Sequence, residues 1–363
     1  MIKKGLLALL FVTAVFIGCQ ENSTDIPNEQ QDQTSVDMTD FYLFTDEVQN
    51  LSKGAGKNKT KNCYSMEVLN RQLNEIPGLY KKMYDVELKT RKFLAAKGKP
   101  TKPGGGGSDG GTGGDDVDVA PINDGLGVIN IPVYVHVVYS NANQNISNTQ
   151  IASQISVLNE DFRKANNDLN LPSGTTFAND ATDVEIEFTL ANTFRYSNAR
   201  TSWGTNNAVK SAYPPVSPST HLNIWVAEIG GGILGYAQFP GGNSATDGVV
   251  ISPQYFGTTG FVSAPFNKGR TATHEVGHYL NLRHIWGDGR CRQDDFVADT
   301  PSSDGPNYGC PSFPTVNCKT PDMTMNYMDY TNDACMYMFT DGQRNRMRAI
   351  LNPGGARAAL AGN

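Results

Sequence analysis

The sequence predicts an α+β domain built on a twisted mixed sheet, and three observations carry this prediction. Four segments rich in β-branched and aromatic residues, which favour strands, lie between residues 128 and 252. An amphipathic helix follows the first of them, and a second helix near residue 275 holds three of the five histidines. The order strand, helix, strands, helix is typical of an α+β domain with a mixed sheet.

The elements follow one another from the first strand, VINIPVYVHVV at residues 128–138, where Pro132 indicates an irregularity or a sheet edge. The next helix starts at Ser147, which forms a capping-box pattern with Gln150. Its apolar face consists of Ile151, Ile155, Leu158 and Phe162. The segment DVEIEFTL, residues 183–190, alternates between apolar and polar residues and predicts a half-buried strand. Two more strands are predicted at residues 222–229 and 247–252.

The N-terminal residues predict export. Two lysines precede a thirteen-residue apolar run, residues 5–17, which is too short to span a bilayer but suits a signal peptide over residues 1–18. The run ends in FIGC, which resembles the lipobox of bacterial lipoproteins, with Phe16 where leucine is usual. Cys19 would then carry the lipid, which would be the only attachment to a membrane. The alternative is an ordinary cleaved signal with an incidental cysteine.

Composition limits the partners of the chain. The hydrophobic fraction of 39% is enough for a sizeable core. The net charge is −6, and acidic and basic residues are interspersed. No basic patch is present to bind phosphates, so the sequence argues against nucleic acid as a partner.

Composition also divides the chain into segments. A polar stretch cannot bury enough surface to fold and predicts a disordered tether, whereas the run PGGGGSDGGTGGDD predicts a flexible linker. Between them the apolar spacing predicts helices interrupted at Pro77 and Gly78. The expected segments are a tether at 19–60, a helical segment at 61–98, a linker at 99–126, a compact domain at 127–352 and a tail at 353–363.

The segment HEVGHYLNLRH, residues 274–284, has the spacing of a metal site. His274 and His278 are four residues apart, so both rings project from one face of a helix. His284 can join them only if the helix ends and the chain turns back. Asn281 suits that turn, because asparagine tolerates the left-handed conformation better than most residues.

Three histidines predict a catalytic zinc, because they leave one tetrahedral position open for water. Zinc lowers the pKa of such a water to about 7. Glu275 follows the first histidine and is placed to accept a proton from this zinc-bound water, as a general base does. The predicted reaction is hydrolysis of peptide bonds, so the partners are protein or peptide substrates.

Longer motifs show a resemblance to a known family. The histidine segment matches the metzincin pattern H-E-x-x-H-x-x-G-x-x-H, with asparagine in the place of glycine. The segments that resemble the pappalysin family of metzincins, in particular its bacterial cytophagalysin branch, are GRTATHEVGHYLNLRH, VADTP, MNYMDYTNDACMYMFTDGQRNRM, ILGYAQFPGG and DGVVIS. The resemblance covers roughly residues 63–350. It implies a metzincin-like catalytic domain with an active-site helix and a loop-rich C-terminal subdomain stapled by disulfides.

The resemblance assigns roles near the C-terminus. Met328, in NYMDY, would form the Met-turn that supports the zinc site from below. Tyr330 would approach the zinc and stabilise the tetrahedral intermediate. The alternatives are that Met328 fills the core, as methionine-rich patches commonly do, and that Tyr330 is an ordinary packed tyrosine.

The resemblance also assigns roles to five of the cysteines. Family relatives pair the four late cysteines first to third and second to fourth, which implies Cys291 with Cys318 and Cys310 with Cys335. A four-cysteine zinc site is the alternative, and export argues against it. Cys63 resembles the cysteine of the family's pro-segment, whose thiolate occupies the open zinc position until the segment is removed. The alternative is an incidental cysteine or one paired between molecules.

Three further expectations concern activation, calcium binding and substrate binding. Cleavage of the pro-segment is expected between Arg91 and Asp118, and no residue there identifies the activating protease. Asp294, Asp295 and Asp299 could bind calcium, although acidic loops are commonly just solvated. The segments GGGILGYAQF and DGVVIS could supply a sheet edge to which an extended substrate adds.

Two functions from different classes follow. The first is an exported zinc endopeptidase, made as a zymogen and anchored by lipid at the outer membrane or cell surface, unless removal of the pro-segment releases it. The second is a surface binding or adhesion lipoprotein whose metal only supports the fold. Glu275 favours the enzyme, because a purely structural site does not need a carboxylate beside its first ligand.

Overall fold

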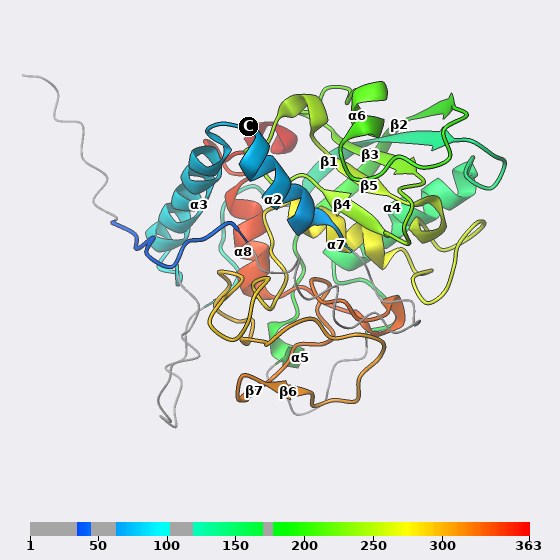
Figure 1. The fold of residues 1–363 in the computed structure, drawn as a ribbon. Helices are drawn as coiled ribbons and strands as arrows, with labels where there is room; N and C mark the ends of the chain where they lie inside the picture. Colours follow the sequence, from blue (N-terminus) through cyan, green and yellow to red (C-terminus); the bar gives the residue numbers. More distant parts are fainter. Residues whose placement is uncertain (1–34, 45–62, 102–118, 170–176) are drawn as a thin grey trace, which may run out of the picture. The chain divides into compact units, whose positions relative to one another are not determined.

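A five-stranded mixed sheet is the centre of the fold (Figure 1). The computed structural model describes residues 35–44, 63–101, 119–169 and 177–363. The strand order is β2-β1-β3-β5-β4, in which β4 is antiparallel to β5 and the other pairs are parallel. The strands are β1 (Ile129–Tyr139), β2 (Ile186–Ser197), β3 (Leu222–Ala227), β4 (Gly235–Ala237) and β5 (Val249–Ile251), and a separate pair consists of β6 (Val316–Asn317) and β7 (Thr320–Pro321). The predicted α+β class with a mixed sheet is confirmed.

The helices flank this sheet. They are α2 (Ser65–Glu75), α3 (Leu79–Ala96), α4 (Asn148–Phe162), α5 (Phe177–Asp180), α6 (Ala208–Ala212), α7 (Arg270–Tyr279) and α8 (Asp341–Ala349). Across the described ranges, no helix combines the length and apolar character needed to cross a bilayer. The predicted signal segment and Cys19 lie outside these ranges.

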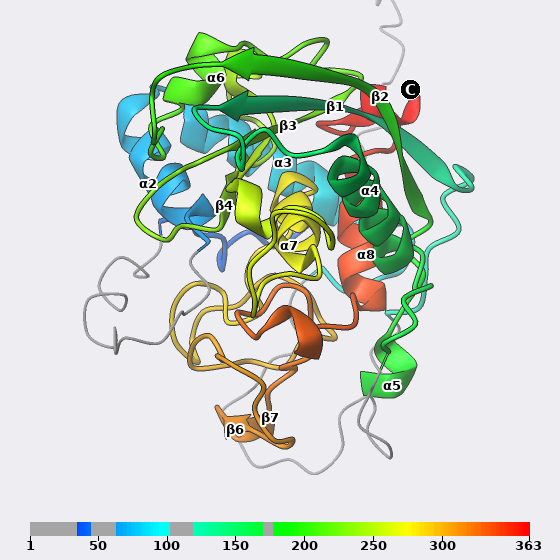
Figure 2. The ribbon, with the colours of Figure 1, turned by 90° about the vertical axis from the view of Figure 1, so that its right-hand side faces the viewer.

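Two faces of the sheet bury different cores. Figure 2 shows α4 and α7 on one face and α6 on the other. The alternate residues Ile131, Val133 and Val135 of β1 pack toward α4 and α7, in the cluster that also contains Ala272 and Val276. On the other face, Trp225 of β3 packs with Val209 of α6. The period of two along the strands therefore places α7, with its histidines, directly against the sheet.

Two predicted strands differ in detail from the observed ones. β1 is central and not an edge, and Pro132 is tolerated because β1 pairs with β3 only from Val133 onward. A register shift on the β2 side follows between Val133 and Tyr134. β2 starts at Ile186, later than predicted, and continues to Ser197 through residues that alternation did not identify, because they are largely exposed.

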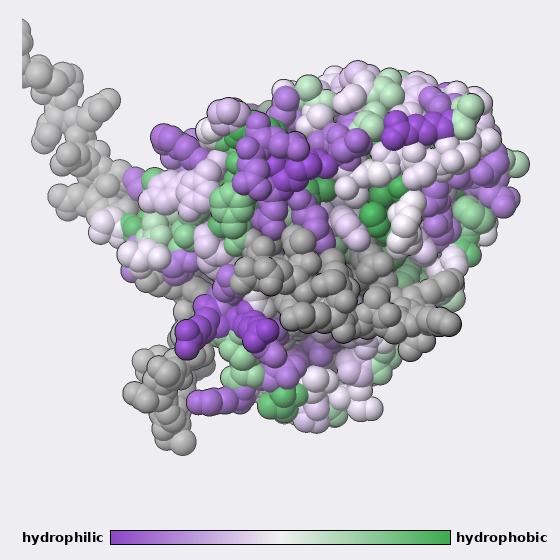
Figure 3. Space-filling model, in the orientation of Figure 1, coloured by the Kyte–Doolittle hydropathy of each residue, from purple (hydrophilic) through white to green (hydrophobic). Residues whose placement is uncertain are grey.

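The N-terminal helices lie over the later part of the chain. α2 buries Met66, Val68 and Leu69 and leaves a hydrophilic outer face, which is visible in Figure 3. α3 runs beside α8, where Glu87 and Arg346 form a buried ion pair at 2.7 Å. These contacts hold the helical segment against the domain that contains the histidines.

Three segments expected to be loose are packed where they are described. Leu43 is buried although it lies in the predicted tether, and Tyr42 donates a hydrogen bond to the carbonyl of Gly287. In the predicted linker, Ile122 is buried and its N–H donates to Asn345 of α8. The predicted tail packs as well, because Leu360 is buried. Local apolar residues thus anchor segments whose average composition is polar.

Candidate metal centre

Three imidazole rings meet beside α7. His274 and His278 lie on one face of this helix because they are four residues apart. Their Nε2 atoms lie 3.2 and 3.1 Å from Nε2 of His284, which follows the helix. All three rings are fully buried. Ring nitrogens that converge in this way are typical of a shared cation.

The chain turns back toward the helix at Asn281. This residue has φ of 77°, in the left-handed region, two positions after the last helical residue. The N–H of Leu282 donates to the carbonyl of Gly277 at 2.9 Å, and the N–H of Asn281 donates to the carbonyl of His278 at 3.0 Å. These two bonds define a Schellman ending, which returns the chain and brings His284 to the other two rings.

The left-handed φ at Asn281 leads to a stability prediction. We expect Asn281→Ala to lower the free energy of unfolding by about 1 kcal/mol, because alanine is strained at this φ. Asn281→Gly is the matched control and should cost less, because glycine adopts this φ without strain. Urea unfolding of the zinc-loaded chain measures both variants. Equal stability of the alanine and glycine variants would contradict the proposed role of the backbone conformation.

Each imidazole is oriented through its other nitrogen. Nδ1 of His274 donates to the carbonyl of Tyr327 at 2.7 Å, and Nδ1 of His278 donates to the carbonyl of Leu282 at 2.8 Å. Nδ1 of His284 contacts the carboxylate of Asp288. With the Nδ1 atoms engaged, all three Nε2 atoms face the same point. The sequence-based predictions missed Asp288, and its only signal was the spacing of four residues after His284.

The group fits zinc. Sγ of Cys63 lies 3.5 Å from Nε2 of His278, and the donor atoms of Cys63 and the three histidines all lie within 4.8 Å of one another. A tetrahedral zinc holds nitrogen and sulfur ligands roughly 3.3 to 3.7 Å apart. The Nε2–Nε2 separations of 3.1 and 3.2 Å and the Sγ–Nε2 separation of 3.5 Å are close to that range. Within the described ranges, this is the only group of three or more potential ligand side chains that could hold a metal ion.

Glu275 lies beside the three histidines and is not part of the group of potential ligands. Its Oε2 accepts a hydrogen bond from the hydroxyl of Ser65 at 2.7 Å, and that oxygen accepts one from the N–H of Ala237 at 2.8 Å. Gly235 of β4 leaves room for the carboxylate, because a Cβ there would lie 3.0 Å from Cγ of Glu275. The carboxylate therefore lies between α7 and the edge strand β4.

Met328 and Tyr330 both lie at the metal centre. A Cβ on Gly277 would meet the sulfur of Met328 at 2.5 Å, so the glycine allows the turn at Met328 to pack tightly beneath α7. The ring of Tyr330 lies 4.8 Å from that of His284. The hydroxyl of Tyr330 donates to the backbone carbonyl of Cys63 at 3.3 Å.

The segment around Cys63 covers the edge strand. Cys63 forms a parallel bridge with Gly235 of β4, and the N–H of Tyr64 donates to the carbonyl of Gly235 at 3.1 Å. Of the two segments expected to supply a sheet edge, GGGILGYAQF contains the edge strand β4, whereas DGVVIS contains β5, which lies between β3 and β4. Nearby, burial raises the pKa of Glu67 to about 7, and the negative charges of Asp288 and Glu275 add to this increase.

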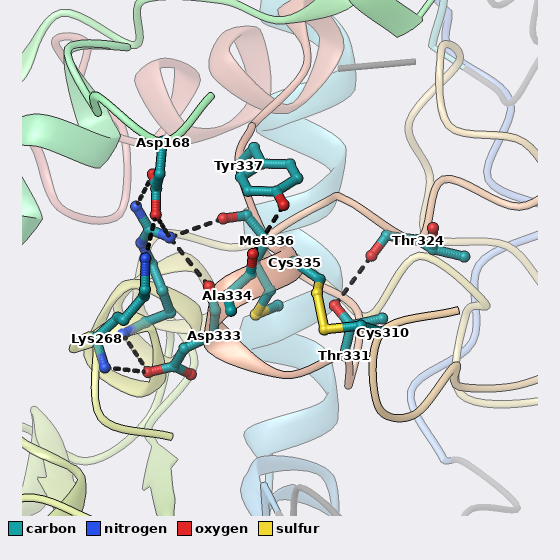
Figure 4. Close-up of a disulfide and its surroundings, with 11 residues drawn as sticks. Asp168, Lys268, Cys310, Thr324, Thr331, Asp333, Ala334, Cys335, Met336 and Tyr337 are labelled. Atoms are coloured by element: carbon teal, nitrogen blue, oxygen red, sulfur yellow. Dashed lines mark hydrogen bonds and ion pairs between the residues drawn. A yellow bond between two sulfur atoms is a disulfide. The ribbon is translucent and has the colours of Figure 1, made fainter. Parts of the chain in front are cut away.

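Two disulfides hold the loop-rich C-terminal region. Cys291 is bonded to Cys318 and Cys310 to Cys335, which are the pairs that the resemblance implies. Figure 4 shows the second of them beside Asp333, whose carboxylate accepts the backbone N–H of Lys268. This bond links the disulfide loop to the start of α7.

The three aspartates considered for calcium are largely satisfied by protein groups. Asp299 accepts hydrogen bonds from Thr340 and from the N–H of Gly342 at 2.7 and 2.8 Å. Burial raises the pKa of Asp299 to about 6. Burial raises the pKa of Asp295 well above its usual range, and the charge of Asp294 adds to this effect. These three side chains do not form a group that could hold a metal ion.

Comparisons with known proteins agree with this geometry. Residues 218–352 match the family model described as pregnancy-associated plasma protein-A. An extracellular metalloprotease of Arthroderma benhamiae is 32% identical over 226 residues, covering 60% of this chain and 76% of the relative. One from Coccidioides posadasii is 35% identical over 239 residues, covering 61% and 76%.

Solved structures extend the similarity to the N-terminal helices. Mature mirolysin of Tannerella forsythia, in complex with a cleaved peptide, is 47% identical with a TM-score of 0.62, and the match covers 64% of this chain and 96% of that one. A promirolysin mutant from the same organism is 39% identical with a TM-score of 0.69, covering 83% and 97%. The larger coverage by the precursor indicates that this chain shares its additional N-terminal segment.

Proposed function

Because the chain belongs to the pappalysin family, we propose that this zinc metalloprotease is an endopeptidase in which His274, His278 and His284 hold the zinc and Glu275 is the general base. The convergence of three buried Nε2 atoms is the observation that carries the proposal. Zinc, when bound, supplies a Lewis acid and lowers the pKa of water in its open position.

Three further side chains have separate roles in the proposed reaction. Glu275 accepts the proton of the attacking water and later delivers it to the leaving amine, because its carboxylate lies beside the ligands and faces β4. The hydroxyl of Tyr330 donates to the backbone carbonyl of Cys63 in the precursor. Once the pro-segment has departed, the same hydroxyl donates a hydrogen bond to the oxyanion of the substrate. Met328 supports the ligands from below through its contact with Gly277.

The substrate is an extended protein or peptide segment. Among the strands, β4 is the edge of the sheet nearest the histidines, and its Gly235 already pairs with a backbone at Cys63. After removal of that segment, the same edge binds a substrate by strand addition. The cleaved peptide bound to mature mirolysin is consistent with this class of substrate.

Two residues of the helical segment, Cys63 and Ser65, make the precursor latent. The thiolate of Cys63 would be a further ligand of the zinc and would exclude the water that the reaction needs. Ser65 blocks the carboxylate of Glu275, because its hydroxyl donates a hydrogen bond to the group that has to accept a proton. The expected cleavage range between Arg91 and Asp118 narrows to the part after α3, because Arg91 is buried within that helix, which ends at Ala96. Cleavage there, followed by departure of the helical segment, would free the zinc position and the carboxylate of Glu275.

Export and anchoring complete the proposal. The similar proteins are named extracellular metalloproteases, and export of this chain agrees with its two disulfides. We propose a signal peptide over residues 1–18 and lipid attachment at Cys19, which places the enzyme at the outer membrane or cell surface. Calcium is not part of the proposal, because the described residues Asp294, Asp295 and Asp299 do not form a group of side chains that could hold a metal ion.

Metal removal tests the function. We expect a chelator to abolish cleavage of a denatured protein by the processed chain and zinc to restore it, because the open zinc position polarises the water. Elemental analysis should find one zinc per chain. Calcium alone should restore no cleavage. Full cleavage by metal-free protein would refute the proposal.

A further inference from the structure

One buried carboxylate joins two elements of the metal centre. Asp161 is the penultimate residue of α4, and its side chain is fully buried. Its Oδ1 accepts hydrogen bonds from the hydroxyl of Tyr327 at 2.9 Å and from Nε of Arg270 at 3.1 Å. Its Oδ2 accepts one from the hydroxyl of Thr273 at 2.6 Å. Arg270 and Thr273 belong to α7, and Tyr327 directly precedes Met328.

Each of these partners acts on His274. Thr273 is its neighbour in sequence, and Arg270 lies one helical turn earlier. Tyr327 supplies the carbonyl that accepts the Nδ1 hydrogen bond of His274 at 2.7 Å. Asp161 thus holds both the helix that carries the ring and the backbone group that orients the ring.

Arg270 also links the start of α7 to the loop that contains the disulfide of Cys335. Its guanidinium donates to the carboxylate of Asp168 at 2.9 Å and to the carbonyls of Asp333 and Met336 at 3.1 and 2.8 Å. Asp168, Asp333 and Met336 are among the residues that Figure 4 shows around the disulfide. The start of α7 is therefore fixed on two sides by charged groups that are largely removed from water, which makes its position strongly determined.

We propose that Asp161 is a positioning residue for zinc, which acts through Thr273 and Tyr327 to hold His274 in the direction and tautomer that the metal requires. The inference rests on the proposed function, because it takes the three-histidine group as the zinc site. Partners that orient a metal ligand commonly change metal affinity by 10- to 100-fold when they are removed. The expected consequence is weaker zinc binding without any change in the ligands themselves.

Zinc competition with a chelator in the full chain tests this inference. All variants carry Glu275→Gln so that self-cleavage does not alter the chain. Thr273→Val removes the hydroxyl at nearly constant volume, and Thr273→Ser keeps it. Tyr327→Phe removes the bond to Asp161, and Tyr337→Phe removes a hydroxyl in the same region that bonds only to the carbonyl of Ala334.

We expect Thr273→Val and Tyr327→Phe each to lower the affinity for zinc about tenfold, while Thr273→Ser and Tyr337→Phe match the parent. The increase in melting temperature on adding zinc should shrink in the same two variants. If they bind zinc like the parent and only the metal-free melting temperature falls, the network supports the fold alone and the inference is wrong. A parent that binds no stoichiometric zinc overturns the proposed function first, and the inference with it.

Discussion

Replacing Glu275 with glutamine should leave zinc in place and lower kcat/KM of the processed enzyme by at least about 10³-fold. Glutamine keeps the shape of the side chain and cannot accept a proton at neutral pH. The three histidines proposed to hold the metal remain, since Glu275 lies beside the group of potential ligands and is not part of it. Loss of activity with retention of metal is the signature of a general base.

The measurement compares cleavage of a denatured protein with the zinc content of the same preparation. Glu160→Gln is the matched control, because Glu160 lies on the outer side of α4 and accepts a hydrogen bond only from the exposed Ser156. This control should retain wild-type activity. A Glu275→Gln enzyme with more than about a tenth of wild-type activity would exclude the assigned role. It would favour the alternative of a binding lipoprotein with a structural metal.

The core of the site was predictable because it follows from local geometry. The spacing of His274 and His278 places both on one helical face, and a residue that tolerates a left-handed φ has to precede His284 if that ring is to return. Asn281 meets this condition with a φ of 77°. Eleven consecutive residues therefore contain the information for the whole three-histidine arrangement.

The groups that orient these ligands were not predictable in the same way. Asp288 has the appearance of any loop aspartate, and Asp161 comes more than 100 residues before the helix that it holds, at a separation of 112 from Thr273. Tyr327 contributes a backbone carbonyl, which no side-chain pattern reveals. Contacts of this kind depend on how distant elements pack, and a single sequence carries no periodic signal for them.

The packed N-terminal segment was missed for a related reason. The polar composition of residues 19–60 predicts a tether, yet FYLF at residues 41–44 forms an apolar cluster within it. Phe41 stacks on Phe296 with ring centroids 5.9 Å apart. An average over forty residues hides Phe41 and Tyr42, whose rings both contact Phe296 far along the chain. The same effect explains the packing of Leu360 in the predicted tail.

Latency should depend on sulfur at position 63. We expect the uncleaved Cys63→Ala chain to gain proteolytic activity of at least about tenfold over the wild-type precursor, because a charged ligand to the metal is worth more than a neutral hydrogen bond. The time course of self-processing and of substrate cleavage measures the gain. Asn74→Ala is the control, because Asn74 is exposed on α2 and its side chain bonds only within that helix.

Ser65→Ala separates the two components of latency. A single hydrogen bond of about 1 kcal/mol predicts an increase in precursor activity of roughly fivefold, through easier release of Glu275. Cobalt substitution adds a readout that is independent of activity, because a thiolate ligand gives charge-transfer absorption that Cys63→Ala should abolish and Ser65→Ala should retain. If Cys63→Ala is as latent as the wild type and its cobalt spectrum is unchanged, the sulfur does not bind the metal.

The remaining contacts of the pro-segment explain why neither substitution should release it completely. Glu87 of α3 lies between Arg91 and Arg346, and all three side chains are almost fully buried. Charges desolvated in this way are costly to separate, so α3 stays bound to α8 when the metal contact alone is lost. The Cys63→Ala precursor should therefore be less active than the processed enzyme. The difference between them measures how much of the latency comes from covering β4 rather than from binding the zinc.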